Sequence, residues 1–230
     1  ELDTYNHSVA HDLRNPVISI RGMADIAAMA IQAGDPLRAA DCIARIARSA
    51  DQADTLIRNL MELARLGKRA IRLQPLPART AFEAMRASLE LQIAAADAQV
   101  TLDVPDAILH TDPVLLQQAL TNLVVNALHA CGPGGHVSLT SKTVEAAKPG
   151  ETTRRRYSSI AVVDDGVGVS DELRQSIFEP FFSTRPAGEG TGLGLPIVTS
   201  IVDEHGGFVT LDSARGSGST FTMYLPEALS

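Results

Sequence analysis

The first third of the chain carries apolar side chains that, after a first step of seven residues, recur at steps of three and four. From residue 2 to about residue 33 they fall at Leu2, Val9, Leu13, Pro16, Ile20, Met23, Ala27 and Ala30, and from residue 37 to about residue 66 at Ile43, Ile46, Ala50, Ala53, Ile57, Leu60 and Ala64. This spacing is typical of helices that pack along a narrow seam. Between the two runs Gly34 breaks the pattern, Asp35 is a suitable helix N-cap, and Pro36 suits the first helical position. The sequence therefore predicts an antiparallel helical hairpin.

This hairpin has more apolar surface than it can cover by itself. Two helices cannot bury both seams together with the neighbouring Ile and Leu side chains, whereas two hairpins that associate as a four-helix bundle can. We therefore expect a homodimer.

One polar residue of the first helix stands out. His11 lies two positions from both Val9 and Leu13, and at about 100° per residue this spacing points its imidazole away from the seam. An exposed histidine on a helix is usually solvated surface, which is how we interpret His7, one turn earlier. Pro16 removes a backbone donor, so we expect a local kink near His11.

Beyond the hairpin, helices and strands are mixed. Prolines and a Gly-Lys-Arg run indicate a linker, so we expect a hairpin over 1–67, a linker over 68–77 and a second domain over 78–230. Helices are expected near 78–95, 112–131, 171–178 and 193–204, and strands near 99–104, 107–110, 136–145, 157–164, 208–213 and 219–225. This order does not alternate strictly, which favours helices layered on one face of a largely antiparallel sheet. The predicted fold class is α+β, a helical hairpin followed by an α/β two-layer sandwich.

Composition excludes several classes of protein. Twenty Lys and Arg against 27 Asp and Glu leave a net charge of −7, which argues against a nucleic-acid or anionic-membrane partner because both need a basic face. The two cysteines are too far apart for a disulfide framework or a zinc cluster, so a reducing compartment is expected. No apolar run reaches the roughly 18–20 residues of a bilayer crossing. Because the chain begins at Glu1 rather than Met, we expect a soluble piece of a longer protein, without membrane contact of its own.

The predicted helix 112–131 is apolar on most of its surface but carries one polar stripe. Gln118, Asn122 and Asn126 follow at steps of four, with His129 three residues further on. Buried amides need hydrogen-bond partners. The stripe therefore indicates either amides that pair with one another or a cavity for a polar ligand or a hydrated metal ion.

Two glycine-containing segments could bind a nucleotide. In the first, a strand ends in Asp164-Asp165-Gly166-Val167-Gly168, which places a carboxylate beside flexible backbone; it could accept a hydrogen bond from an exocyclic amine or could be a plain turn. In the second, alternating glycines over 188–194 lead directly into an apolar helix. Their N–H groups and the positive end of the helix dipole suit phosphate oxygens, and the immediate start of the helix argues against a mere linker.

Taken together, these segments resemble the catalytic core of sensor histidine kinases over essentially the whole chain. Ser8–Val17 resembles the phosphoacceptor H-box, Asn122–Ala127 the N-box, Asp164–Gly168 the G1 box, Phe178–Phe182 the F box, Gly188–Leu195 the G2 box, and Gly218–Phe221 the last nucleotide-pocket segment of the family that includes Hsp90, gyrase and MutL. The resemblance implies a Bergerat-type ATP-binding domain and a cytoplasmic location, as part of a longer sensor protein.

The resemblance also implies residue roles. His11 would attack the γ-phosphate of ATP, with Asp12 orienting or deprotonating the imidazole, and the phosphoryl group would pass to an aspartate in the receiver domain of a response regulator. Asn122 and Asn126 would hold Mg²⁺, and Asp164 would bind the adenine amine. The remaining nucleotide contacts would be His129, Gly166, Gly168, Arg185, Gly188, Gly190, Thr191, Gly192, Leu193, Gly194, Leu195 and Thr220.

Three details of the motifs qualify this assignment. Asn15, four residues after His11, occupies a position where members that dephosphorylate their regulator carry Thr or Asn, so regulator phosphatase activity is expected. His129 stands where many relatives have Lys, which makes one phosphate-binding cation pH-dependent. The short segment before the G2 box resembles the lid of nitrogen-regulator kinases, with Arg185 as its phosphate contact.

Two other functions fit parts of the pattern. An ATP-driven clamp of the same superfamily would carry Glu at the position of Asn122 and would not need an exposed histidine in a hairpin. A degenerate scaffold would dimerise and dock regulators without turnover, but it would not need every nucleotide motif to be intact.

Overall fold

The computed structural model of the protein describes residues 2–65, 70–104, 107–185 and 190–227; for residues 2–13 and 62–65 it describes the backbone only. The chain divides into two compact units. The first comprises residues 1–64 and 180–193, and the second comprises residues 65–179 and 194–230.

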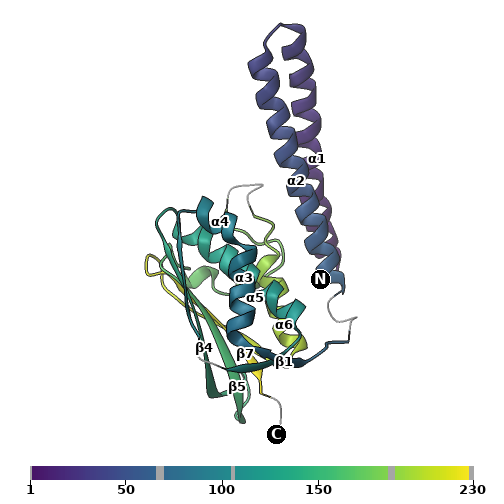
Figure 1. The fold of residues 1–230 in the computed structure, drawn as a ribbon. Coiled ribbons are helices and arrows are strands. Elements are labelled where there is room, and N and C mark those ends of the chain that lie inside the picture. The colour runs from purple at the N-terminus through teal and green to yellow at the C-terminus, as the bar shows by residue number, and fades with distance from the viewer. Residues whose placement is uncertain (1, 66–69, 105–106, 186–189, 228–230) are drawn as a thin grey trace. The chain divides into compact units, whose positions relative to one another are not determined.

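The first unit contains the predicted helical hairpin (Figure 1). Helix α1 (Leu2–Gln32) and helix α2 (Pro36–Arg65) are joined by a tight turn in which Gly34 adopts a φ of +73°. Asp35 caps α2, because its Oδ1 accepts the backbone N–H of Arg38 at 3.0 Å. The N-cap and the glycine break are therefore confirmed.

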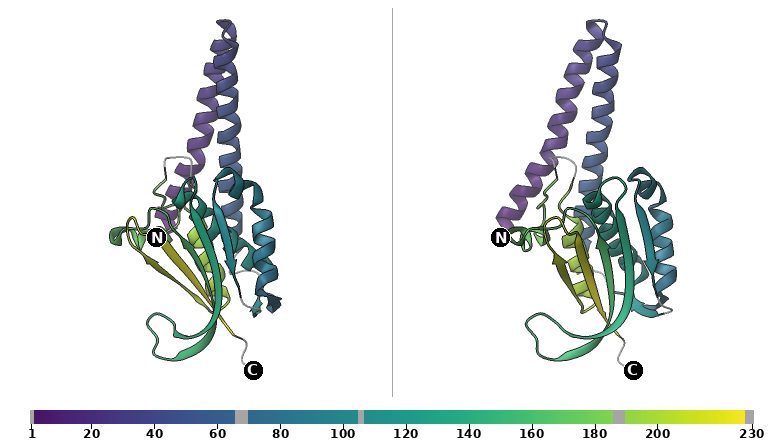
Figure 2. Two further views of the ribbon diagram at one scale, coloured as in Figure 1. Left: turned by 60° about the vertical axis from the view of Figure 1, so that its left-hand side comes forward. Right: turned by 90° about the vertical axis from the view of Figure 1, so that its left-hand side faces the viewer.

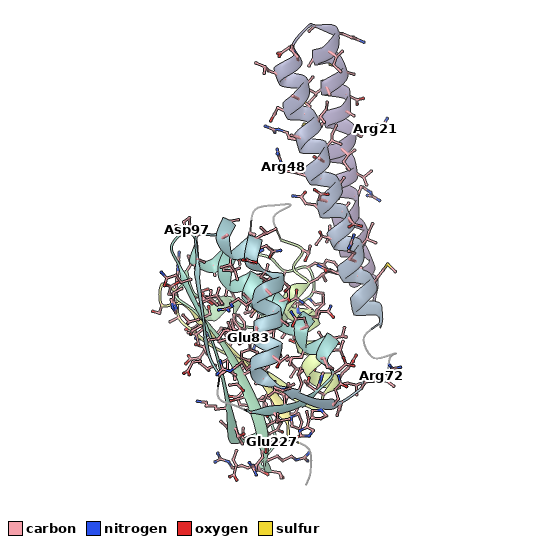
Figure 3. All side chains as sticks on the ribbon, in the orientation of Figure 1. Arg21, Arg48, Arg72, Glu83, Asp97 and Glu227 are labelled. Carbon is pink, nitrogen blue, oxygen red and sulfur yellow. The ribbon has the colours of Figure 1, made fainter. Side chains whose placement is uncertain are left out.

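Small side chains form the seam inside the hairpin. Ala27 and Ala30 on α1 and Ala39, Cys42 and Ser49 on α2 are buried. Small residues let two helix axes come close together. Figure 3 shows the side chains of Arg21 and Arg48 pointing outward from the hairpin.

The buried seam on α2 is shifted by one position along the sequence from the predicted seam. Cys42, Ser49 and Leu56 are buried, whereas Ile43 and Ile57, which were expected to lie in the seam, are 57% and 46% exposed. The two rows repeat every seven residues and lie next to each other on the helix, so spacing alone does not distinguish them. The hydroxyls of Ser19 and Ser49, 3.1 Å apart, lie between the helices and help to fix which row faces α1.

The second unit is built on a five-stranded sheet. In spatial order its strands are β2 (Gln99–Asp103), β4 (His136–Ala147), β5 (Arg154–Asp164), β7 (Ser219–Pro226) and β6 (Phe208–Ser213). Strands β2 and β4 are parallel and the other neighbouring pairs are antiparallel, which confirms the largely antiparallel sheet. Strands β4 and β5 continue past their neighbours as a two-stranded arm (Figure 2).

Three helices cover one face of this sheet (Figures 1 and 2). Helix α5 (Pro113–Cys131) contacts β4 and β5, helix α6 (Gly194–Glu204) contacts β6 and β7, and helix α3 (Ala78–Ser88) packs on α5. The side chain of Asp112 caps α5 by accepting the N–H groups of Val114 and Leu115 at 3.0 and 3.3 Å. The two-layer sandwich is therefore confirmed.

Helix α5 is the core helix of the sandwich. Within the described part of the chain it is the one helix whose length and composition would also suit a membrane crossing. Eight of its side chains are buried, however, and Leu116, Ala119, Leu120, Leu123 and Val124 are at most 2% exposed. Its apolar surface is therefore explained by packing in this fold.

Some elements differ from the expectation. Residues 74–77, placed in the linker from their prolines, form strand β1 (Gln74–Pro77), which pairs with β3 (Ile108–Thr111) in a separate two-stranded sheet. Proline is tolerated in such a strand because an edge leaves backbone donors unused. The helix predicted over 78–95 is divided into α3 and α4 (Glu90–Ala95), because Leu89 departs from helical geometry. The segment expected to be helical over 171–178 consists of two 3₁₀ turns, η1 (Asp171–Leu173) and η2 (Ser176–Phe178).

Candidate nucleotide-binding site

Asp164 lies at the end of the central strand β5 and is only 4% exposed. Its Oδ1 accepts the backbone N–H of Gly166 at 2.9 Å, and Ser219 lies directly opposite it on β7. Burial raises the pKa of the Asp164 carboxyl above its ordinary value, and the hydrogen bonds from Gly166 and Ser219 oppose this rise. The Asp164 carboxylate is therefore a hydrogen-bond acceptor with a fixed orientation and little contact with solvent. Such a group can recognise one specific donor.

The glycines after Asp164 are required by close backbone packing. A Cβ on Gly166 would lie 2.5 Å from the carbonyl carbon of Ala130, and a Cβ on Gly168 would lie 2.0 Å from the carbonyl oxygen of Ala214. Gly168 also has a φ of +66°, a conformation that favours glycine. The segment that follows the carboxylate is thus pressed against the end of α5 and the turn between β6 and β7.

Ser219 lies beside Asp164, a position that the sequence interpretation gave to Thr220. Asp164 pairs with Ser219 across β5 and β7, and Val163 pairs with Thr220. Directly opposed residues share a face and successive residues alternate, so Thr220 lies on the face opposite to the carboxylate. Ser219 is 5% exposed and is a site residue that sequence reasoning missed. The alternation of side chains along β7 would have indicated Ser219 if the pairing of β5 with β7 had been known.

The polar stripe of α5 meets the first turn of α6. Asn122 and Asn126 are both half-buried, and a Cβ on Gly194 would lie 3.4 Å from Asn126 Nδ2 and 3.8 Å from Asn122 Oδ1. Gly194 begins α6, Leu195 follows it in the first turn, and both are half-buried. The stripe therefore faces the helix start that follows the glycine-rich segment, as a polar-ligand site requires.

His129 continues the stripe but is exposed. Its Nδ1 lies 2.5 Å from the carbonyl oxygen of Val125. A carbonyl can only accept, so Nδ1 carries a proton and donates to it. This bond ties the imidazole to its own helix.

The glycine-rich segment belongs to the first unit up to Leu193. The loop that contains it is closed at its base, because the N–H of Phe181 donates to the carbonyl of Gly192 at 3.0 Å. A Cβ on Gly192 would lie 2.4 Å from the carbonyl carbon of Phe181, and a Cβ on Gly190 would lie 3.1 Å from Cδ of Arg185. These glycines are therefore fixed by packing within the segment, and Gly188 lies outside the described residues.

Thr191 and Leu193 complete that end of the segment. Leu193 is fully buried, and its N–H donates to Thr191 Oγ1 at 3.4 Å. The same hydroxyl oxygen lies 3.1 Å from the amide nitrogen of Asn59 on α2. The segment is thus attached to the second helix of the hairpin within the first unit.

The predicted phosphoacceptor segment lies on α1. His11 and Asp12 are helical, but their side chains lie outside the described residues. Helix α1 continues through Pro16, so the missing backbone donor does not end the helix. Asn15 is exposed one turn after His11.

Comparisons with known proteins agree with this architecture. A family model described as histidine kinase-, DNA gyrase B- and HSP90-like ATPase matches residues 111–229, and one described as His Kinase A (phospho-acceptor) domain matches residues 2–69. Fold and site thus define an ATPase domain of this class, joined to a phosphoacceptor domain. The chain belongs to the family of sensor histidine kinases.

Individual relatives cover most of the chain. The sensor histidine kinase ZraS of Escherichia coli (strain K12) is 34% identical over 230 aligned residues, which cover 95% of this chain and 44% of that protein. The solved structure of histidine kinase ThkA in complex with the response regulator protein TrrA matches with a TM-score of 0.77 and 25% identity, covering 99% of this chain and 62% of that one. Histidine kinase AdeS of Acinetobacter baumannii, at 19% identity, shares the fold with a TM-score of 0.71, over 95% of this chain and 98% of that one. This chain spans less than half the length of ZraS.

Proposed function

We propose that this chain phosphorylates itself on His11 with ATP and passes the phosphoryl group to an aspartate in the receiver domain of a response regulator. The observation that carries this proposal is the buried Asp164–Ser219 pair at the end of β5, in an ATPase domain joined to a phosphoacceptor hairpin. The response regulator in the ThkA structure supports the choice of partner.

The reaction assigns a separate task to each part of the chain. A neutral nitrogen of His11 attacks the γ-phosphorus, a nitrogen–phosphorus bond forms, and the bond to the bridging oxygen breaks so that ADP leaves. Asp12 orients the imidazole and takes up its proton. Asp164 accepts the exocyclic amine of adenine, which orients the nucleotide in the site.

Mg²⁺ fits the residues on α5. Asn122 and Asn126 offer two neutral amide oxygens on one helix face, and Mg²⁺ binds through a few oxygen ligands while it keeps several waters. The ion supplies charge neutralisation at the phosphates. We assign further phosphate contacts to Arg185, His129 and the N–H groups of the glycine-rich segment.

The functional unit we propose is a homodimer joined through a four-helix bundle. Several large apolar side chains of the hairpin remain exposed in the single chain: Val17, Ile18, Met29, Ile31, Ile43, Ile57 and Met61. A second hairpin would cover them. We place the chain in the cytoplasm, where ATP is available, as part of a longer sensor protein.

We further propose that the chain dephosphorylates its regulator. The exposed Asn15, one turn from His11, could orient the attacking water with its amide. Replacement of Asn15 by Ala should leave labelling of His11 intact and slow regulator dephosphorylation about tenfold or more, the scale of general catalytic positioning. Unchanged dephosphorylation would remove this role from Asn15.

The first experiment is incubation with γ-labelled ATP and Mg²⁺. The wild type and the matched control His7→Gln should acquire acid-labile, base-stable label, and His11→Gln should not. Label that persists in His11→Gln would contradict the assignment of the nucleophile. If the wild type binds ATP but is never labelled, the ATP-driven clamp is favoured; a chain that does not bind ATP would be a scaffold.

A further inference from the structure

Three polar side chains form a row across three adjacent strands. Asp164 on β5 is directly opposite Ser219 on β7, and Ser219 is directly opposite Ser213 on β6. Their exposed fractions are 4%, 5% and 6%. Buried polar groups in one row must satisfy one another or neighbouring backbone, so the order of donors and acceptors along the row is constrained.

Ser213 has its full set of hydrogen-bond partners. Its Oγ accepts the backbone N–H of Val169 at 2.8 Å. Its one hydroxyl proton faces the carbonyl oxygen of Gly218 at 2.7 Å and Ser219 Oγ at 3.1 Å. The side chain therefore ties the segment that follows Asp164 to the turn that precedes Ser219.

This arrangement determines which group donates and which accepts at each step of the row. Ser213 shares its one proton between the Gly218 carbonyl and Ser219 Oγ, so Ser219 accepts on that side and its own hydroxyl proton remains available for Asp164, its neighbour across the β5–β7 pair. Without the Ser213 hydroxyl, the carbonyl of Gly218 and the N–H of Val169 would both lose a partner. Rotation of Ser219 towards the free carbonyl would then take its proton away from the carboxylate.

The backbone around the row is also held tightly. Arg174 donates from Nη2 to the carbonyl of Ser213 and from Nε to Asp171 at 2.6 Å. The N–H of Gly216 donates to the carbonyl of Val167 at 2.7 Å. The serines can therefore determine the orientation of Asp164, because the strand ends that carry them have little freedom to move.

We propose that Ser213 is a positioning residue of the nucleotide site: through Ser219 it holds the Asp164 carboxylate in the orientation that accepts the exocyclic amine of adenine. The inference rests on the proposed ATP binding and adds a residue that need not touch the ligand.

ATP affinity of the whole chain tests this role. Ser213→Ala should weaken ATP binding about three- to tenfold, the effect of one buried hydrogen bond. Ser213→Thr, which keeps the hydroxyl, should restore most of the affinity. The matched control is Ser217→Ala, an exposed serine of the same turn, which should bind ATP like the wild type.

A double-mutant cycle separates this role from general loss of structure. If Ser213 acts through Ser219, Ser213→Ala should weaken ATP binding in the wild type but add little to Ser219→Ala. The acidic limit of ATP binding should also move to higher pH in Ser213→Ala, because a carboxylate that loses a donor holds its proton more tightly. The titratable groups that face Asp164 are Asp165 and Cys131, and neither is altered by the substitution.

The outcomes are distinct. ATP affinity of a folded Ser213→Ala within twofold of the control, or fully additive effects of the two serine substitutions, would overturn the positioning role and leave the proposed function standing. A wild type that does not bind ATP would remove both.

Discussion

At the scale of single residues, the binding role proposed for Asp164 comes at a cost to the stability of the fold. Burial raises the pKa of this carboxyl, so folding favours its protonated form. The native state therefore loses stability as pH rises from the ordinary carboxyl pKa through the raised value, and the loss is complete above that value. A buried charge of this kind is expected where the charge is used.

Asp164→Asn tests this balance. We expect ATP affinity to fall at least about tenfold, because a neutral amide is a weaker acceptor and presents its own donors to the adenine amine. The thermal midpoint at pH 7 should equal or exceed that of the wild type, because no charge is buried. Isothermal titration with ATP and a melting curve measure the two effects, and a large loss of stability would contradict the argument.

The thiol of Cys131, at the end of α5, is expected to react slowly with alkylating agents. Burial, followed by a hydrogen bond with Asp165, raises the pKa of its thiol to about 11. At pH 8 almost none of it is thiolate, so alkylation by iodoacetamide should be roughly a hundredfold slower than for an ordinary cysteine with a pKa of about 8.5. The measurement uses Cys42→Ser, which leaves Cys131 as the one cysteine.

Asp165→Asn in the same background provides the comparison for this prediction. Removing the neighbouring charge should lower the thiol pKa and speed alkylation. Equal rates in the two proteins would show that Asp165 has no influence on the thiol.

At the scale of elements, the turn between β6 and β7 depends on glycines for two different reasons. Gly216 and Gly218 have φ values of +79° and +76°. A Cβ on Gly216 would meet nothing within 4 Å, whereas a Cβ on Gly218 would lie 2.0 Å from the carbonyl oxygen of Asp164. Gly216 is therefore required for its positive φ alone. Gly218 is required both for its positive φ and because a Cβ there would clash.

The pair Gly216→Ala and Gly218→Ala separates these requirements. Gly216→Ala should lower the free energy of unfolding by about 1 kcal/mol, the cost of a left-handed alanine. Gly218→Ala should lower it by about 1–3 kcal/mol more, the usual cost of overpacking, and should also weaken ATP binding. Urea denaturation of the two variants measures the difference, and equal losses would contradict the close approach.

Most elements of the fold could be predicted from sequence because their signals are local. Asp35 and Asp112 mark helix starts by the capping bonds that the structure contains. The helix expected near 112–131 becomes the core helix, and the strands expected near 208–213 and 219–225 appear at those positions. Helix capping and apolar periodicity each act within a few residues, so they can be recognised without knowing the fold.

The features that sequence missed depend on partners far along the chain. Strand β1 exists because Ile108–Thr111 pairs with it, and the hairpin seam includes Cys42 rather than Ile43 because of how α1 packs. The same holds for the site, where Ser219 replaces Thr220 beside Asp164 through the pairing of β5 with β7. Register and packing face are properties of two segments at once, so one segment cannot reveal them.

At the scale of the whole molecule, the exposed apolar row of the hairpin predicts association. The double substitution Ile43→Glu and Ile57→Glu places charges on that row and leaves the buried seam untouched. Light scattering after size exclusion should give twice the chain mass for the wild type and one chain mass for this variant at micromolar concentration. Leu91→Glu, at a residue 86% exposed in the second unit, is the control and should remain dimeric. A wild type that is monomeric would contradict the bundle.

The hydrogen bond between Phe181 and Gly192 has a consequence for the length of the loop that these residues enclose. The bond between Phe181 and Gly192 closes the loop at its base, whatever number of residues lies between them. The entropy of closing a loop grows only with the logarithm of its length, by about 0.6 kcal/mol per doubling. A change in the number of residues between Phe181 and Gly192 should therefore alter the free energy of unfolding only slightly, as long as the bond at the base is kept.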